Sequence, residues 1–337
     1  MASAFILGGT GQIGYAVAER LTCLGWEVTL GSRTPAPNSW PWRHVIIDRN
    51  ERNSLRETLE SGADLVVDCV ALTPWHADQL IEVQSGIGHL VMISSAIVYS
   101  DGAGLSLDSA AERGFPDFPI PISTDNPTVR PGPETYATRK VEIERRLIKK
   151  AQIPVAILRP CAIHGPYSKR AREWWFVKRL LDGRQRIPLA YGGRSRFQTS
   201  STSAVAKAIL QSLASHHTQI LNVADADAPT VAEIGREIMR NLGIEAELIG
   251  LPDEPYPAEK GGTPWSGEKP IVLASSIIGV ETYAQSVPRV IEWLQQATSQ
   301  RAWTEVLPQL AQYPASFFDY AIDEEAIGTE GAVPLSP

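Results

Sequence analysis

The strand–turn–helix unit at the start of this chain constrains its fold more than any other part of the sequence. An apolar run over 3–7 leads into Gly8-Gly9-Thr10-Gly11-Gln12-Ile13-Gly14, and a helical pattern follows to about Leu24. At such a junction the first glycine permits a tight turn, the second lets the backbone approach a pyrophosphate, and the third permits close helix–strand packing. The N–H groups at the helix start then face the phosphates. This context predicts a dinucleotide site that includes Gly8, Thr10, Gly11, Gln12, Ile13 and Gly14.

Strand-like runs alternate with helical stretches over the first half of the chain. The runs lie at 27–30, 44–47, 64–70, 89–95 and 155–158. Alternation of this kind predicts a doubly wound parallel α/β sheet. Later helical patterns at 202–214, 230–242 and 286–297, with a short run at 220–223, favour a smaller C-terminal α/β lobe. We therefore expect a dinucleotide-binding domain over 1–166, to which later elements return, a mainly substrate-binding lobe over 167–322 and a flexible tail over 323–337.

Composition limits the partners of the chain. The 337 residues are 43% hydrophobic and carry a formal net charge of −7, which is typical of a soluble globular protein and argues against a nucleic-acid partner. No apolar run reaches the roughly 20 residues of a membrane span, and the early strand leaves no room for a signal peptide. The scattered Cys23, Cys69 and Cys161 predict reduced core thiols of a cytoplasmic protein and no metal site.

The end of the second strand bears on the choice of cofactor. An NAD site usually has an acidic residue there to hold the ribose hydroxyls, but this chain has Ser32 and Arg33. Arg33, helped by Ser32, can pair with a 2′-phosphate, so NADP is preferred and NAD stays possible. A solvated loop arginine is the alternative. Asp48 is expected near the adenine amino group, although a simple loop carboxylate would look the same. Val70, the last residue of the run at 64–70, and Ala71, which follows it, are also expected to line the cofactor site.

Tyr136 and Lys140 are the candidate catalytic pair. Residues four apart on a helix share one face, and an ammonium beside a phenol lowers the pKa of the phenol. Tyr136 is therefore a candidate acid/base, with Ser95 as a second hydrogen-bonding group on the same reacting oxygen. The segment 101–133, rich in proline, joins Ser95 to this helix, and we expect it to form a substrate-facing wall.

Four motifs together resemble the extended short-chain dehydrogenases/reductases, the NAD-dependent epimerase/dehydratase family. They are the glycine turn at 8–14, Ile93-Ser94-Ser95-Ala96-Ile97-Val98-Tyr99, Tyr136 with Lys140, and Arg159-Pro160-Cys161-Ala162-Ile163-His164-Gly165-Pro166. The resemblance implies that Ser95 is the catalytic serine, Tyr136 the acid/base, and Lys140 the residue that holds the nicotinamide ribose. It also implies that Pro160 and Ile163 flank the nicotinamide, and that the chain can form a homodimer through the Tyr-Lys helix.

The chain departs from the family pattern at three places. His164 replaces the usual tyrosine, which makes it either a polar substrate contact or a packing histidine. The stretch 197–202 lacks the usual histidine and aspartate, which puts sugar recognition there in doubt. Ala96 and Ile97 stand where sugar dehydratases of the family carry an acid pair, and because apolar residues cannot move protons, water elimination is not expected.

A basic stretch over 169–196 suggests an anion site, since arginine matches phosphate geometry. Within it Arg194 and Arg196 are expected to bind substrate; a solvated helix face is the alternative. Trp174 and Trp175 fit either base stacking or core packing.

The leading hypothesis is an NADPH-dependent reductase of a carbonyl substrate that uses Ser95, Tyr136 and Lys140. A nucleotide-sugar epimerase with retained NAD is the alternative. A non-catalytic dinucleotide-sensing or RNA-binding relative is a third hypothesis, disfavoured because the chain keeps both Tyr136 and Lys140. The expected partner is a small molecule, anionic or nucleotide-linked, and no membrane partner is expected.

Overall fold

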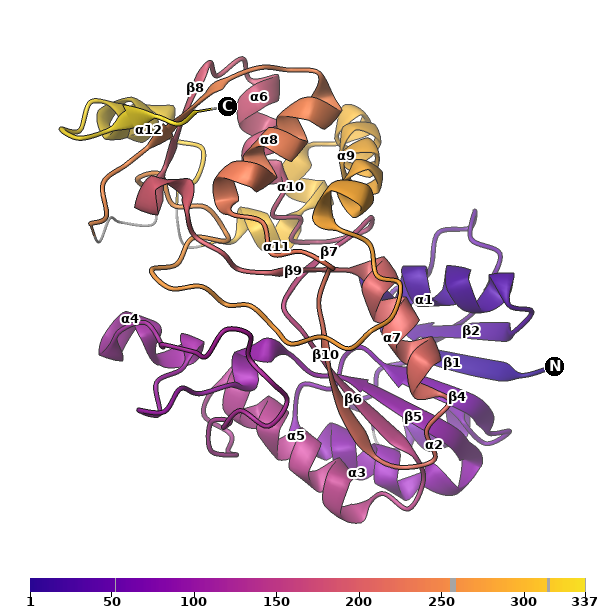
Figure 1. The fold of residues 1–337 in the computed structure, drawn as a ribbon. Coiled ribbons are helices and arrows are strands. Elements are labelled where there is room, and N and C mark those ends of the chain that lie inside the picture. The colour runs from indigo at the N-terminus through magenta and orange to yellow at the C-terminus, as the bar shows by residue number, and fades with distance from the viewer. Residues whose placement is uncertain (52, 255–258, 314–315, 337) are drawn as a thin grey trace. The chain divides into compact units, whose positions relative to one another are not determined.

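The computed structural model describes residues 1–51, 53–254, 259–313 and 316–336. The chain divides into two compact units, whose elements are labelled in Figure 1. The first unit comprises Met1–Cys161, Thr202–Ala224 and Leu273–Val280. The second comprises Ala162–Ser201, Asp225–Val272 and Glu281–Pro337. No helix among the described residues combines the length and apolar character needed to cross a membrane.

One sheet of seven parallel strands forms the centre of the first unit. Its order, β10-β6-β5-β4-β1-β2-β3, confirms the doubly wound α/β fold predicted from the sequence. Strands of such a sheet are covered on both faces and are therefore mostly apolar, as the fully buried β6 illustrates, in which Arg159 is the one charged residue. The strands are β1 (Ser3–Leu7), β2 (Glu27–Ser32), β3 (Arg43–Ile46), β4 (Ala63–Asp68), β5 (Ile87–Ile93), β6 (Val155–Pro160) and β10 (Gln219–Val223).

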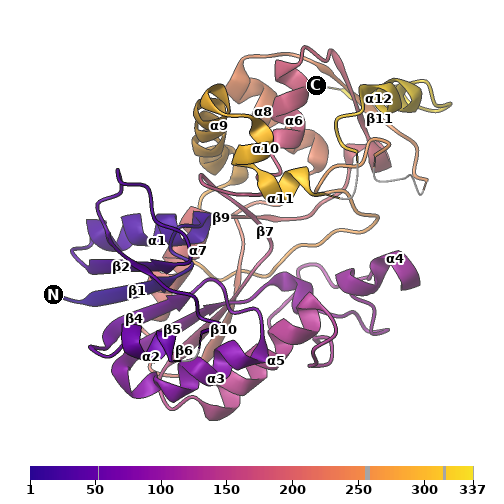
Figure 2. The ribbon, with the colours of Figure 1, turned by 180° about the vertical axis from the view of Figure 1, so that it is seen from behind.

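Helices cover both faces of this sheet. Helix α1 packs beside α7 on one face and α3 beside α5 on the other, as Figures 1 and 2 show from opposite sides. The helices of this unit are α1 (Gln12–Cys23), α2 (Ser54–Thr58), α3 (Pro74–Glu82), α4 (Ala110–Arg113), α5 (Tyr136–Lys150) and α7 (Thr202–Ser212), with 3-10 turns η1 (Gln84–Gly86), η2 (Ala96–Val98) and η3 (Leu107–Ser109).

The elements predicted at 202–214 and 220–223 lie in the first unit, not in a C-terminal lobe. They correspond to α7 and β10, and β10 pairs in parallel with β6. Helix α7 makes the crossover that this parallel pairing requires. Later elements were expected to return to this domain, but sequence order alone did not identify these two as the returning ones, because the pairing partner lies far upstream.

The second unit packs helices against two small sheets. A three-stranded sheet has the order β12-β11-β8, and β7 pairs with β9. Trp175, Phe176, Trp265 and Tyr283 belong to its buried core. Its elements are β7 (Ala162–His164), α6 (Trp174–Leu181), β8 (Arg186–Leu189), η4 (Ala190–Gly193), β9 (Thr199–Ser201), α8 (Val231–Leu242), β11 (Glu247–Gly250), α9 (Tyr283–Gln300), α10 (Trp303–Val306), α11 (Pro308–Ala311), α12 (Tyr320–Ile327) and β12 (Val333–Pro334).

The segment predicted as a flexible tail begins inside a packed helix. Asp323, in α12, is buried and pairs with the buried Arg179 of α6 at 3.0 Å. Further along, β12 adds an antiparallel strand to β11. At least the start of the predicted tail is therefore packed, through a contact with Arg179 that lies 144 positions away in the sequence.

Candidate functional site

The turn after β1 needs glycine for backbone reasons. Gly8 has a φ of +78° and donates its N–H to the Gly31 carbonyl at 2.8 Å. A Cβ at Gly14 would lie 2.5 Å from Gly9 Cα, so only glycine lets α1 approach the turn this closely. The sequence pattern at these two positions therefore has a direct geometric cause.

The start of α1 is open to a ligand. A Cβ placed on Gly11 would meet only the Gly8 carbonyl oxygen, at 3.4 Å, so one side of the turn has room. Gly11 is the N-cap of α1 and supplies no side-chain acceptor to the first-turn N–H groups. Gln12 Oε1 is buried and has no hydrogen-bond partner among the described residues. Exposed helix donors beside a glycine turn fit a pyrophosphate, and Thr10 and Ile13 flank them.

The residues around the ends of β2 and β3 differ in whether their side chains already form hydrogen bonds or ion pairs within the protein. Ser32 Oγ donates to the Thr34 carbonyl at 2.6 Å and contacts His44 Nε2 at 2.8 Å. The Arg33 side chain is exposed and forms no ion pair within the described part of the chain. Asp48 Oδ1 accepts from the backbone and side-chain nitrogens of Asn50 at 2.9 and 3.0 Å. Arg33 is therefore open to an anion, whereas Asp48 shapes its own loop.

Lys140 is fixed beneath the carboxyl ends of β4 and β5. Its side chain is only 2% exposed, and Nζ donates to the carbonyls of Ala71 at 2.7 Å and Ile93 at 2.8 Å. Burial lowers the pKa of Lys140 to about 8. An ammonium has three donors, so one remains for a ligand. Val70, beside Ala71, packs against the Gly8 turn. The structure thus brings Gly8, Val70, Ala71 and Lys140 together.

Tyr136 begins α5, one turn before Lys140. Lys140 Nζ lies 5.5 Å from the centre of the Tyr136 ring, and the ring is 38% exposed. The expectation that Lys140 lowers the pKa of Tyr136 is wrong for this arrangement. Burial and the carboxylate of Asp108 raise the pKa of Tyr136, while Arg139 opposes them. The Lys140 ammonium donates instead to the carbonyls of Ala71 and Ile93.

Ser95 follows β5 and is oriented by its own turn. Its Oγ accepts from the Ile97 N–H at 3.3 Å as the N-cap of η2. No acceptor for the Ser95 hydroxyl proton is found in the part of the chain that the structure describes. A hydroxyl arranged in this way can donate to a substrate oxygen. Ala96, in η2, is buried.

A buried ion pair holds α5 against the sheet. Glu144 lies one turn after Lys140, and Arg159 of β6 contacts its two carboxylate oxygens at 3.1 and 2.6 Å. Ser94 also donates to Glu144. Both charged side chains are almost fully buried, and Pro160 directly follows Arg159 in β6. Sequence reasoning missed this pair, although Glu144 continues the i, i+4 series of Tyr136 and Lys140.

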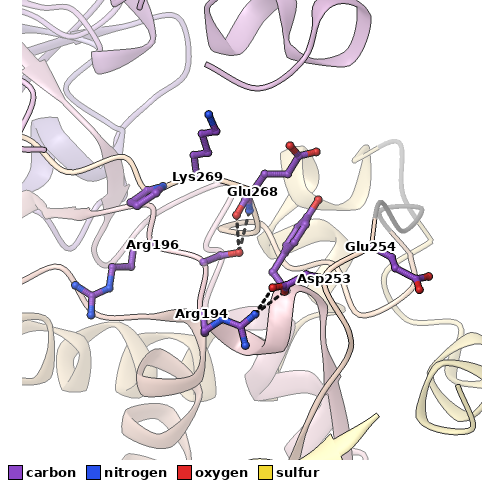
Figure 3. Close-up of a pocket in the computed structure, with 10 residues that line it drawn as sticks. Arg194, Arg196, Asp253, Glu254, Glu268 and Lys269 are labelled. Carbon is purple, nitrogen blue, oxygen red and sulfur yellow. Dashed lines mark hydrogen bonds and ion pairs between the residues drawn. The ribbon is translucent and has the colours of Figure 1, made fainter. Parts of the chain in front are cut away.

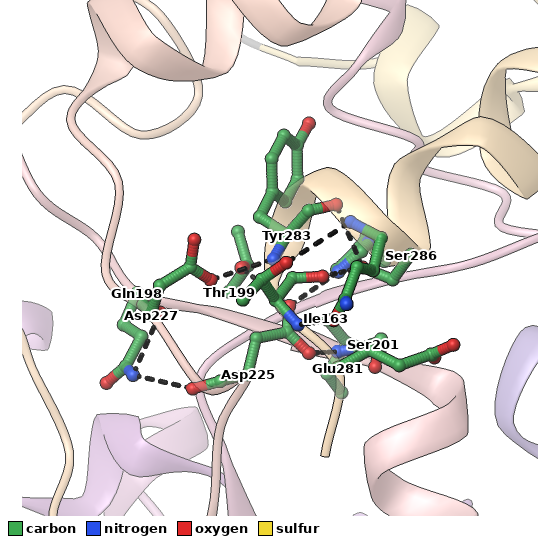
Figure 4. Close-up of polar contacts among 12 residues, drawn as sticks. Ile163, Gln198, Thr199, Ser201, Asp225, Asp227, Glu281, Tyr283 and Ser286 are labelled. Atoms are coloured by element: carbon green, nitrogen blue, oxygen red, sulfur yellow. Dashed lines mark hydrogen bonds and ion pairs between the residues drawn. The ribbon is translucent and has the colours of Figure 1, made fainter.

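His164, in the second unit, was predicted to be either a substrate contact or a packing histidine. Its side chain is 2% exposed, and Nε2 lies 2.8 Å from Asp225 Oδ2. Asp225 also accepts from Thr199 Oγ1 at 2.7 Å and Ser201 N at 2.8 Å, in the network of Figure 4. Asp225 raises the pKa of His164, against the effect of burial. The structure favours the packing alternative for His164; the preceding residue, Ile163, is partly exposed in β7.

The two arginines predicted to bind substrate line one pocket of the second unit. This pocket, of about 370 Å³, is shown in Figure 3. Arg194 Nη2 lies 2.5 Å from both oxygens of Asp253, so its charge is already paired. Arg196 is exposed, points away from that pair, and forms no ion pair among the described residues. Arg196 is therefore the better anion ligand, with Lys269 also lining the pocket.

Most of the basic stretch is neutralised within the second unit. Lys178 pairs with Asp182, Arg179 with Asp323, Arg184 with Glu324 and Arg186 with Glu247. Trp174 and Trp175 are buried and belong to the core, so they offer no stacking surface. These contacts leave Arg196 as one candidate anion ligand of the stretch and weaken the RNA-binding hypothesis.

The free thiols are distributed differently from the prediction. Cys161 is buried, Cys69 is partly buried and Cys23, near the end of α1, is exposed. Burial and the neighbouring Asp68 raise the pKa of the Cys69 thiol far above its usual range. Cys69 is thus an unreactive thiol, although it stands next to Val70.

Solved structures share this fold at low sequence identity. MoeE5 in complex with UDP-glucose and NAD is 19% identical, with a TM-score of 0.65 over 88% of this chain and 99% of that chain. The dTDP-glucose 4,6-dehydratase of Bacillus anthracis is 15% identical, with a TM-score of 0.67 over 91% and 100%. The UDP-glucose 4-epimerase of Thermus thermophilus is 18% identical, with a TM-score of 0.62 over 88% and 99%. No curated protein sequence matches the chain.

The sequence profile of the NAD dependent epimerase/dehydratase family matches residues 4–224. This match covers the seven-stranded sheet from β1 to β10 and includes the glycine turn, Ser95, Tyr136 and Lys140. It confirms both the predicted family and the expectation that the chain is an NAD(P)-dependent enzyme of the oxidoreductase/epimerase class. The chain belongs to the NAD-dependent epimerase/dehydratase family.

Proposed function

We propose that this protein is an NADPH-dependent reductase of a carbonyl substrate, with Ser95, Tyr136 and Lys140 as its catalytic residues. The observation that carries the proposal is the position of Lys140. A buried ammonium, fixed by the Ala71 and Ile93 carbonyls at 2.7 and 2.8 Å, lies next to the glycine turn and under Tyr136. Burying a charge is costly, and a purely structural role does not require a lysine at this place.

Each side chain has a distinct task in this reaction. When bound, the nicotinamide supplies the hydride. Tyr136 donates the phenol proton to the carbonyl oxygen as the general acid. The Ser95 hydroxyl donates a hydrogen bond to the same oxygen. The third N–H of Lys140 is placed to hold a ribose hydroxyl. Gly11 and the first turn of α1 hold the pyrophosphate, with Pro160 beside the nicotinamide.

Arg33 is the basis for proposing NADP over NAD. Its exposed guanidinium has no counter-ion in the described residues, and no acidic residue ends β2. Arg33→Glu should weaken NADPH binding by at least about tenfold and change NADH binding far less, because a charge-assisted pair contributes roughly 1.5–3 kcal/mol. Calorimetric titration of both cofactors provides the comparison. Equal losses for the two would reject the 2′-phosphate assignment.

A nucleotide-sugar epimerase with retained NAD is the second candidate, and the pocket at Arg196 favours it. An exposed arginine with no ion pair among the described residues, in a pocket of about 370 Å³, suits a phosphate group. MoeE5 and the solved epimerases are named with such substrates or activities. Incubation with UDP-glucose would then yield its C4 epimer with no net consumption of cofactor. Consumption of NADPH in step with product would favour the reductase.

Tyr136→Phe tests the proposed chemistry. The variant keeps the ring and loses the proton that the reaction needs, so turnover should fall at least about 100-fold with cofactor affinity nearly unchanged. The assay follows NADPH absorbance with a panel of carbonyl compounds and nucleotide sugars. Tyr99→Phe is a matched control, because Tyr99 is buried and its hydroxyl donates to Asn222. Full activity of Tyr136→Phe would reject the proposal, and a loss of cofactor binding would mean that Tyr136 is structural.

A further inference from the structure

The loop between β4 and α3 carries one of the two carbonyls that hold Lys140. The Ala71 carbonyl oxygen accepts from Lys140 Nζ at 2.7 Å. The N–H of the same peptide unit is that of Leu72, and it donates to His76 Nδ1 at 3.0 Å. His76 is the third residue of α3, and its side chain is 4% exposed. A single peptide unit therefore joins a buried histidine to the buried lysine.

The peptide unit between Ala71 and Leu72 makes these two hydrogen bonds depend on each other. A peptide is planar, and its C=O and N–H groups point in opposite directions. A rotation that takes the Leu72 N–H away from His76 also takes the Ala71 oxygen away from Lys140. The second carbonyl on Nζ belongs to Ile93, the last residue of β5, and lies at 2.8 Å. The sheet orients that carbonyl, whereas Ala71 lies in a loop with no strand partner to orient it.

The contacts of the His76 ring assign its tautomer. Nδ1 accepts from an N–H and therefore keeps its lone pair. Nε2 lies 3.4 Å from Asn50 Oδ1. Because Asn50 Nδ2 donates to Asp48 at 3.0 Å, the amide atom that faces the ring is the oxygen, which is an acceptor. Nε2 then carries the hydrogen, and the ring is neutral.

A buried ion pair surrounds His76 and supports its neutral form. Arg49 pairs with Asp68 at the end of β4, and its Nη2 donates to the His76 carbonyl at 3.0 Å. Burial, and then the charge of Arg49, lower the pKa of His76 to about 4. Lys140 adds to this effect, and Asp68 and the Val70 carbonyl oppose it. The ring therefore keeps Nδ1 as an acceptor at neutral pH.

Helix α3 does not need the bond from Leu72 for its own N-terminus. The N-cap of α3 is Thr73, and Leu72 precedes it. The backbone donors that a helix start leaves open begin at the N-cap residue. The Leu72 N–H is not one of them, so its bond to His76 orients the loop.

We propose that His76 is a positioning residue for Lys140: its Nδ1 atom holds the Leu72 N–H, and the shared peptide unit directs the Ala71 carbonyl to Lys140 Nζ. With two donors fixed in this way, the third N–H of the ammonium keeps one direction. That this third N–H holds a ribose hydroxyl rests on the proposed function, whereas the effect of His76 on the Lys140 ammonium does not.

The tautomer of His76 is tested first, in the wild-type, cofactor-free protein. Long-range ¹H–¹⁵N NMR of ¹⁵N-histidine-labelled protein is recorded between pH 6 and pH 8, and His76→Leu assigns the signals. Nδ1 should show the chemical shift of an unprotonated nitrogen, and Nε2 that of a protonated one, over the whole range. A protonated Nδ1 would overturn the proposal, because it cannot accept from the Leu72 N–H.

Hydrogen exchange of the Lys140 ammonium then tests the coupling. It is measured at pH 6 on ¹⁵N-lysine-labelled protein, and Lys140→Met assigns the signal. His76→Leu removes the acceptor, so the exchange rate should rise at least about threefold, the scale of one net hydrogen bond. His76→Asn should restore the slow rate, because Oδ1 of asparagine, like Nδ1 of histidine, is attached to Cγ. His89→Leu is the matched control, since His89 is a buried histidine of β5 that is 6% exposed.

An exchange rate in His76→Leu equal to that of the wild type would overturn the proposal, as would an equal rise in His76→Asn or in His89→Leu. His76→Phe, which also lacks the acceptor, replaces His76→Leu if that protein does not fold. If the rate responds as expected but Lys140→Met binds NADPH as tightly as the wild type, the positioning stands and the proposed role of Lys140 fails. If Lys140→Met loses NADPH affinity and turnover but the rate does not respond to His76→Leu, the function stands and His76 is only structural.

Discussion

Replacing Arg159 by methionine should strongly destabilise the first unit. Arg159 is 4% exposed and Glu144 is 2% exposed, with nitrogen–oxygen distances of 3.1 and 2.6 Å between them. The guanidinium also lies 4.9 Å from the centre of the Tyr99 ring. In the variant the Glu144 carboxylate stays buried and keeps the hydrogen bond from the Ser94 hydroxyl, but it loses its counter-charge. Removing one partner of such a buried pair costs about 3–5 kcal/mol.

The destabilisation is measured by urea unfolding at neutral pH, followed by circular dichroism and tryptophan fluorescence so that coincident transitions can be checked. A double-mutant cycle with Glu144→Gln isolates the pair. Because the second substitution removes the stranded charge, the double variant should be less destabilised than the sum of the two single variants, by at least about 1 kcal/mol. A loss below about 1 kcal/mol for Arg159→Met, or strictly additive losses, would refute the reasoning.

Two further substitutions test the packing of the glycine turn after β1 and the burial of the Glu173 carboxylate. Gly14→Ala would place a Cβ 2.5–2.7 Å from Gly9 backbone atoms, so we expect roughly 1–3 kcal/mol of destabilisation and weakened cofactor binding in calorimetry. Retained affinity would contradict the close helix approach. Burial raises the pKa of Glu173, whose two carboxylate oxygens have no partner among the described residues. A raised folded-state pKa of an acid stabilises the fold below its unfolded value, near 4.5, and this stability is lost as pH rises through the folded pKa. The melting temperature of Glu173→Gln minus that of the wild type should therefore increase as the pH is raised from 5 to 8. A difference that stays constant across that range would exclude the effect.

Local patterns predicted the framework of the first unit well. The glycine turn, the alternation of strands and helices and the i, i+4 spacing of Tyr136 and Lys140 all act over a few residues, so the sequence displays them directly. The match of the family profile to residues 4–224 confirms the class that these motifs indicated. The catalytic and cofactor roles of the individual residues remain proposals.

The features that the sequence did not reveal depend on contacts between distant segments. Lys140 is held by Ala71, 69 positions earlier, and His164 by Asp225, 61 positions later. Asp108 reaches Ala137 across 29 positions. Local sequence periodicity does not predict such long-range pairs. These pairs nevertheless decide whether a charged side chain is exposed or already bound to another group. For this reason the predicted effect of Lys140 on the Tyr136 pKa was wrong, although both residues were identified.

Calorimetric titration of the purified, cofactor-stripped protein with NADPH and with NADH tests the central claim most directly. We predict one site per chain, with NADPH bound more tightly than NADH because the Arg33 guanidinium is exposed and unpaired among the described residues. Tighter binding of NADH would remove the 2′-phosphate assignment and favour the epimerase. Absence of binding by either cofactor would contradict the proposed function, since the glycine turn and Lys140 would then have no nicotinamide dinucleotide to hold.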